Sequence, residues 1–141
     1  MERIAPAGDV YQAGTLSGNP VAVAAGLATL SQLDNEAYIR LGHLTDRLTA
    51  GLNELAESRS LQVAAAPGLV TLFFRGAPVK NFADAADTDL AAHAQFCRLM
   101  LERGIYLPPA QFEAWFVSLA HDEAAIDETL EAARLSLAEV L

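Results

Sequence analysis

Cysteine and lysine are almost absent: the 141 residues include one of each, Cys97 and Lys80. A single cysteine excludes an internal disulfide and makes a reducing, cytoplasmic compartment the natural environment. Cys97 lies among apolar residues of a helical stretch with no base evident nearby, so we expect a buried, inert thiol. His43 and His93 are expected at the surface or its boundary. Together with His121 they have no metal-ligand spacing, so no metal site is predicted.

Positive charge is also scarce. The formal net charge is −9, which disfavours nucleic acid and anionic membrane surfaces as partners. The longest apolar stretch, Pro20–Leu30, is about half of the ~20 residues that a transmembrane helix needs. Residues 1–6 lack the basic flank and apolar core of a signal peptide. Hydrophobic residues still make up 52% of the chain, which predicts a globular protein.

Helix signals come early in the chain, after a loop over residues 1–18. Asn19 is a good N-cap and Pro20 suits the first helical position. The helix predicted over 21–33 is apolar on almost every side. We therefore expect it to be buried all round, against neighbours that include elements outside this chain. A leucine stripe predicts a second helix over 36–58.

The later part of the chain alternates strands and helices. Residues 61–75 predict two strands joined by a turn, and residues 76–87 a polar loop. A third helix is expected to begin at Asp87 or Thr88 and to end at Gly104. Short strands over 105–107 and 112–119 precede a last helix capped by Asp122. This order predicts an α+β fold, with a small, mainly antiparallel sheet covered by helices.

Residues 11–20, Tyr-Gln-Ala-Gly-Thr-Leu-Ser-Gly-Asn-Pro, form the first candidate site. Gly14 and Gly18 let the backbone approach a ligand, Thr15 and Ser17 add hydroxyl donors, and a helix N-terminus follows. These are the parts of a phosphate cradle. A tight turn with a helix cap and nothing bound explains the same residues equally well.

Glu113 is the second candidate, because aromatic and apolar residues flank it in the segment 108–118. A partly buried carboxylate there would need a partner or a raised pKa, as functional acids often have. A strand-edge glutamate that reaches solvent is the simpler interpretation, and spacing alone favours it.

Both segments resemble signatures of one family, glutamate-1-semialdehyde 2,1-aminomutase, a pyridoxal-phosphate enzyme similar to class III aminotransferases. The resemblance rests on residues 11–20, on 100–109 and on Gln-Phe-Glu-Ala at 111–114, and it continues in order to the last helix. It implies the aspartate-aminotransferase fold (fold type I). Residues 1–33 would be the end of the large cofactor domain, and residues 34–141 the small C-terminal α+β domain.

The resemblance also implies roles for individual residues. Gly14 and Thr15 match a pair that reaches across a dimer interface to the phosphate of pyridoxal 5'-phosphate in the neighbouring subunit. Glu113 matches a glutamate close to the cofactor and its lysine. The implied enzyme is a homodimeric isomerase. It converts a small semialdehyde substrate, glutamate-1-semialdehyde, to 5-aminolevulinate for tetrapyrrole (porphyrin) synthesis.

Two departures limit what the resemblance implies. The Schiff-base lysine is indispensable to such chemistry, but Lys80 lies in a polar loop beyond the first motif and matches no catalytic position. We therefore expect a C-terminal fragment that is inactive alone and does not bind the cofactor tightly. Trp115 stands where the family commonly has a small residue, which could reshape the pocket. The alternatives are a non-catalytic dimerisation module and an independent phosphate-binding domain that uses residues 14–19.

Overall fold

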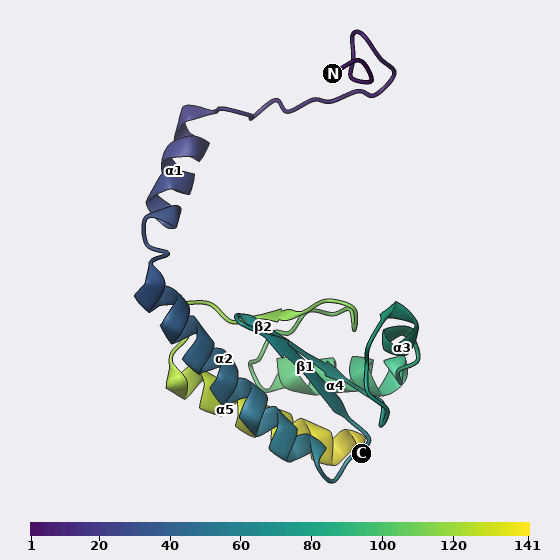
Figure 1. The fold of residues 1–141 in the computed structure, drawn as a ribbon. Coiled ribbons are helices and arrows are strands. Elements are labelled where there is room, and N and C mark those ends of the chain that lie inside the picture. Colours follow the sequence, from purple (N-terminus) through teal and green to yellow (C-terminus); the bar gives the residue numbers. More distant parts are fainter. The chain divides into compact units, whose positions relative to one another are not determined.

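The computed structural model describes all 141 residues, which form two compact units, Met1–Asp34 and Asn35–Leu141 (Figure 1). The assignment of residues 1–33 to a large cofactor domain and of 34–141 to a small domain stays a prediction.

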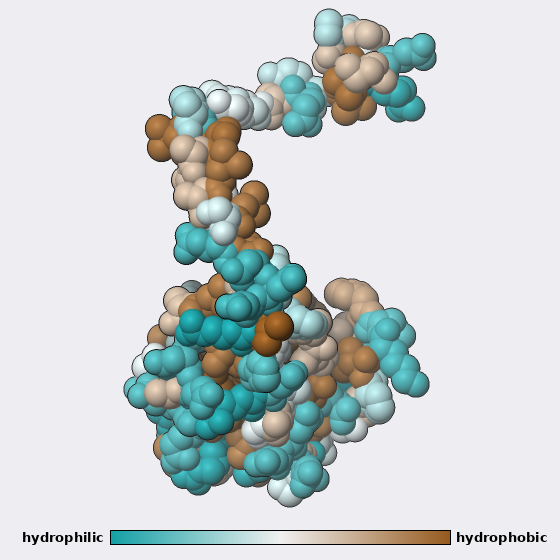
Figure 2. All heavy atoms as spheres, turned by 60° about the vertical axis from the view of Figure 1, so that its left-hand side comes forward, coloured by the Kyte–Doolittle hydropathy of each residue, from teal (hydrophilic) through white to brown (hydrophobic).

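The first unit contains one helix, α1 (Pro20–Leu30). Asn19 caps it as predicted, because its side-chain oxygen accepts hydrogen bonds from the N–H groups of Val21 and Ala22, each at 3.1 Å. The helix ends three residues earlier than expected, and residues after it turn. Within its own unit it is not buried as expected, since none of its residues is buried. The unit has no other helix that could pack on it, and apolar side chains lie along its surface (Figure 2).

Two long helices form the base of the second unit. α2 (Asn35–Ala56) buries the predicted leucine stripe, with Leu44, Leu48 and Leu52 all in the core. α5 (Glu123–Val140) begins after Asp122, whose side chain accepts a hydrogen bond from the N–H of Ala125 at 2.9 Å, as the N-cap prediction required. The two helices pack against each other.

The sheet has three antiparallel strands in the order β1-β2-β3. β1 (Gln62–Ala66) and β2 (Leu69–Phe73) form the predicted hairpin, which turns at Gly68 with a φ of 81°. β3 (Trp115–Phe116) pairs with β2. α2 packs against the hairpin, so the predicted α+β fold with a small antiparallel sheet and covering helices is confirmed.

Two strand predictions were wrong or too long. Residues 105–107 form no strand. The N–H of Ile105 donates to the carbonyl of Met100 at 2.9 Å, so the chain is still closing the preceding helix. The strand predicted over 112–119 covers only β3, because the residues before it form a turn. Within the predicted range, Trp115 and Val117 are buried, and Phe116 is exposed.

The predicted polar loop over 76–87 contains a short helix, α3 (Phe82–Ala86). Asn81 caps α3 by accepting a hydrogen bond from the N–H of Asp84 at 3.0 Å, and asparagine at this position is a local sequence signal for a helix start. The next helix, α4 (Leu90–Glu102), begins after Asp89 rather than at Asp87 or Thr88, because the Asp89 carboxylate takes the N-cap hydrogen bonds.

The core of the second unit is formed by side chains of α2, α4 and α5 together with those of β2 and β3. The residues with no exposed surface are Leu52, Phe96, Met100, Ala133, Ser136 and Leu137.

None of the helices has the length and apolar character that a membrane-spanning segment needs.

Candidate functional site

Gly14 and Thr15 lie in an exposed double turn before α1. The N–H of Ser17 donates to the Gly14 carbonyl at 2.9 Å, and the N–H of Asn19 donates to the Leu16 carbonyl at 3.0 Å. A side chain on Gly14 would place its Cβ 2.2 Å from Ser17 Oγ, so the Ser17 hydroxyl would have to rotate away to make room for it. The tight turn that the sequence predicted is therefore present.

The unpaired hydrogen-bond donors of this turn are backbone N–H groups that precede α1, rather than the first N–H groups of the helix. Asn19 already occupies the first N–H groups of the helix. The N–H groups of Thr15 and Leu16 have no partner within the chain, and Gly18, with a φ of 74°, has open space where a side chain would lie. Free N–H groups beside an open glycine suit a phosphate group. The roles of Gly14 and Thr15 remain predictions.

Glu113 lies in the second unit, in a turn just before β3, and its side chain is exposed. Its N–H donates to the carbonyl of Ala110 at 3.1 Å. The neighbouring Phe112 is 51% exposed, and its ring centroid lies 5.7 Å from that of Phe82 on α3. The glutamate reaches solvent, as the simpler interpretation expected, but it does so from a turn rather than from a strand edge. Its proximity to a cofactor stays a prediction.

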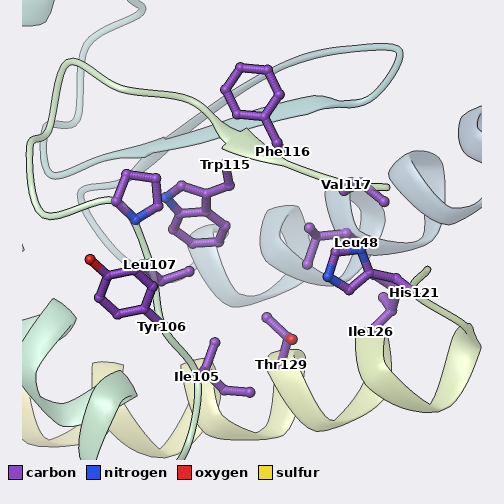
Figure 3. A pocket seen from close by; sticks show the side chains of 11 residues that line it. Leu48, Ile105, Tyr106, Leu107, Trp115, Phe116, Val117, His121, Ile126 and Thr129 are labelled. Atoms are coloured by element: carbon purple, nitrogen blue, oxygen red, sulfur yellow. The ribbon is translucent and has the colours of Figure 1, made fainter. Parts of the chain in front are cut away.

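Trp115 points away from the solvent side of β3. It is 6% exposed and stacks on Phe96, with ring centroids 6.3 Å apart and an interplanar angle of 13°. Figure 3 shows Trp115 beside Tyr106 and opposite Phe116, at a cavity of about 120 Å³ that His121 also lines. Trp115 belongs to the hydrophobic core of this unit, and its effect on a cofactor pocket stays a prediction.

The structure corrects the expectations for Cys97 and His93. His93 is 4% exposed, and its Nε2 lies 3.4 Å from Cys97 Sγ one turn later on α4. A base is therefore adjacent to the thiol, which the four-residue spacing on a helix could have indicated. Burial nevertheless raises the pKa of the Cys97 thiol and lowers the pKa of His93. Both groups are thus favoured in their neutral forms, unlike an activated thiolate–imidazolium pair.

No group of three or more His, Cys, Asp or Glu side chains is placed to hold a metal ion. The single lysine, Lys80, is exposed in the loop before α3, where its backbone N–H donates to Asp84 Oδ2 at 2.9 Å.

Comparison with known proteins gives consistent relatives, although no family model matches the chain. It is 51% identical to a glutamate-1-semialdehyde 2,1-aminomutase of Thermomicrobium roseum over 144 aligned residues, which cover 99% of the chain and 33% of the relative. It is 48% identical to the Thermus thermophilus enzyme of that name, over 97% of the chain and 33% of the relative. The chain thus spans about a third of the length of the curated relatives it matches.

Solved structures show the same fold. A glutamate-1-semialdehyde-aminomutase from Pseudomonas aeruginosa superposes with a TM-score of 0.82 at 23% identity, over 96% of this chain and 31% of that one. An omega-transaminase from Sphaerobacter thermophilus gives a TM-score of 0.77 at 21% identity, over 93% and 30%. A single-substitution variant of the Pseudomonas aeruginosa protein has also been solved in complex with PMP. The resemblance inferred from two sequence motifs is confirmed.

Proposed function

We propose that this chain is the C-terminal part of a pyridoxal-phosphate-dependent glutamate-1-semialdehyde 2,1-aminomutase, an isomerase that forms 5-aminolevulinate for tetrapyrrole synthesis. The observation that carries the proposal is the identity of 46–51% to three aminomutases over 97–99% of the chain. The fold shared with an aminomutase and transaminases supports it.

The chain would contribute binding and proton-handling groups rather than the covalent attachment point. The turn at Gly14 and Thr15 offers unpaired N–H groups to the phosphate of the cofactor. We assign that phosphate to the neighbouring subunit of a homodimer, following the family resemblance. The exposed Glu113 carboxylate can hold or move a proton beside the reacting centre. The pyridoxal ring, when bound, supplies the electron sink of the reaction.

A chimaera tests the proposal. The matching third of the Thermus thermophilus aminomutase is replaced by this chain, and the conversion of glutamate-1-semialdehyde to 5-aminolevulinate is measured. We expect activity within about tenfold of the parent, because half of the replaced residues are identical. The equivalent piece of the Sphaerobacter thermophilus omega-transaminase serves as the control. A folded, dimeric chimaera that transaminates but does not form 5-aminolevulinate would contradict the aminomutase assignment.

The isolated chain gives a second, independent result. Its only lysine is exposed and matches no cofactor-binding position, so we propose that the chain alone is inactive and forms no saturable adduct with pyridoxal phosphate. Borohydride reduction followed by intact-mass measurement checks this. A stoichiometric adduct on Lys80 would contradict the proposal and indicate a cofactor-binding protein in its own right.

A non-catalytic dimerisation module is the second candidate. The wholly exposed apolar helix α1 favours it, since such a surface is suited to burial against a partner. A chain that dimerises but fails to restore activity in the chimaera would support this candidate. In either case we propose a cytoplasmic location and a small-molecule semialdehyde substrate for the complete enzyme.

A further inference from the structure

If the pairing of β2 and β3 continued beyond β3, Glu113 would pair with a residue of β2. In the structure it forms no such pair. Val70 pairs with Trp115, and the N–H of Val117 donates to the Gly68 carbonyl at 2.9 Å. Hydrogen-bonded pairs alternate along an antiparallel ladder. Continued by two residues, this ladder would place Glu113 opposite Leu72, and the N–H of Glu113 would donate a hydrogen bond to the Leu72 carbonyl.

The side chain of Gln111 occupies that position instead. Its Nε2 donates to the Leu72 carbonyl at 2.9 Å in a buried hydrogen bond, and Gln111 is only 3% exposed. The Glu113 N–H is directed backwards to Ala110, so the backbone leaves the sheet one residue before β3 begins. The amide of Gln111 thus replaces a ladder hydrogen bond at the point where the strand ends.

This arrangement is costly by itself. Gln111 Oε1 is buried without a hydrogen-bond partner, and burying an unpaired polar atom opposes folding. An apolar side chain would avoid that cost but could not satisfy the Leu72 carbonyl. Phe112 follows Gln111 and precedes Glu113, and its ring contacts the ring of Phe82 on α3. This contact supports the same turn from its outer side.

We propose that Gln111 is a positioning residue for Glu113: by taking the Leu72 carbonyl, its amide keeps Glu113 out of the β2–β3 ladder and presents the carboxylate to solvent on a turn. The catalytic role of Glu113 rests on the proposed function, whereas the effect of Gln111 on the backbone of this turn does not.

The direct test uses the variant Gln111→Met in the 141-residue chain, followed by NMR. Methionine has a similar length but no donor, so the Leu72 carbonyl becomes available to Glu113. We expect loss of the contact between the Glu113 amide and Ala110, and about fivefold to tenfold slower hydrogen exchange of that amide as it enters the ladder. An unchanged contact and exchange rate would overturn the proposal.

The variant Gln111→Glu adds a rescue. A buried carboxylic acid has a raised pKa, and its protonated form can donate to the Leu72 carbonyl whereas the carboxylate cannot. We expect Glu113 signals like those of the unaltered chain at about pH 5 and like those of Gln111→Met at about pH 8, reversibly. Signals of the displaced form at every pH would contradict the requirement for a donor.

A matched control separates positioning from general destabilisation. Thr45 Oγ1 accepts a buried hydrogen bond from the N–H of Gly68 at 3.0 Å, at the opposite end of the hairpin. Thr45→Val therefore removes a comparable hydrogen bond and should leave the Glu113 amide unchanged. Movement of Glu113 in this control as well would overturn the specific role of Gln111.

The chimaera connects the geometry to catalysis. With Gln111→Met we expect kcat to fall at least about tenfold while KM changes less than about twofold, because a misplaced reacting group weakens the chemical step. An unchanged kcat, together with a displaced Glu113, would overturn the catalytic part of the inference. A chimaera that is inactive even with Gln111 would instead reject the proposed function, and the NMR result would stand by itself.

Discussion

At the residue scale, α2 carries two buried threonine hydroxyl groups, one of which is hydrogen-bonded while the other has no partner. Thr45 Oγ1 donates to the Leu41 carbonyl at 2.7 Å and accepts from the N–H of Gly68 at 3.0 Å. It thereby ties the helix to the β1–β2 turn. Thr49 Oγ1, one helical turn later, is buried and has no partner.

We expect Thr45→Val to lower the free energy of unfolding by about 1–3 kcal/mol, because the Gly68 N–H loses its buried acceptor. Urea denaturation followed by circular dichroism measures the change. The matched variant Thr49→Val removes a hydroxyl that is buried unpaired, so it should be neutral or raise the free energy of unfolding by about 1 kcal/mol. Equal losses in both variants would mean that the two hydroxyl groups are not energetically distinct.

His93 gives the chain a pH dependence of defined sign. Burial lowers its pKa in the folded state below the ordinary value of 6.5. The unfolded state therefore binds more protons below that pH, and the free energy of unfolding falls as the pH drops from about 7 to 5. The fall should be smaller in His93→Gln, measured by urea denaturation across that range. A steeper fall in the variant would reverse the assigned sign.

At the element scale, Gly104 ends α4 with a φ of 85°, as its position in the sequence predicted. An added Cβ would meet no atom within 4 Å, so only backbone strain opposes a side chain there. We expect Gly104→Ala to lower the free energy of unfolding by about 1–2 kcal/mol. Thermal and urea unfolding measure it.

Gly42 is the matched position inside α2. It also has open space around a potential Cβ, but its backbone is helical. Gly42→Ala should raise the free energy of unfolding by about 0.5–1 kcal/mol, because alanine loses less conformational freedom in a helix. The same substitution is thus expected to have opposite effects at the end and in the interior of a helix. A gain in stability at both positions would contradict the conformational argument.

The element scale also shows where sequence patterns failed. The period of apolar residues correctly indicated α2 and α5, because each buries one stripe in a core made by this chain. It failed for residues 105–107, where no neighbouring strand is available. It also missed α3, whose single turn is too short for a period to develop and is marked only by the Asn81 cap.

At the scale of the whole molecule, the two units have unequal means of stabilisation. Every residue of the hydrophobic core belongs to the second unit, and α1 buries none of its side chains. The free energy of folding of the second unit should therefore not depend on residues 1–34.

We expect residues 35–141 alone to unfold at a midpoint within about 3 °C of the complete chain, since no core contact is lost. The complete chain should self-associate through the exposed apolar α1, whereas the shortened chain should stay monomeric. Thermal circular dichroism and sedimentation velocity provide the two measurements. A complete chain that stays monomeric at high concentration would contradict the association, and a much lower midpoint would show that unit 1 contributes to the core.

The sequence by itself determined the elements that depend on local interactions or on one apolar stripe. Asn19 and Asp122 satisfy backbone groups a few residues away, and Gly104 is permitted a φ that other residues avoid. Such features need no distant partner. The two motifs also sufficed to indicate the family, because ordered residue identities survive without knowledge of the fold.

Only the tertiary structure decided the features that depend on residues far apart in the chain. It packed the His93 and Cys97 side chains against the core, and this burial lowers the pKa of His93 and raises the pKa of Cys97. It also brought the Gln111 amide to Leu72, 39 residues away, and thereby ended β3 short of Glu113. Burial and long-range hydrogen bonding arise only when the elements pack, so no local pattern could have indicated them.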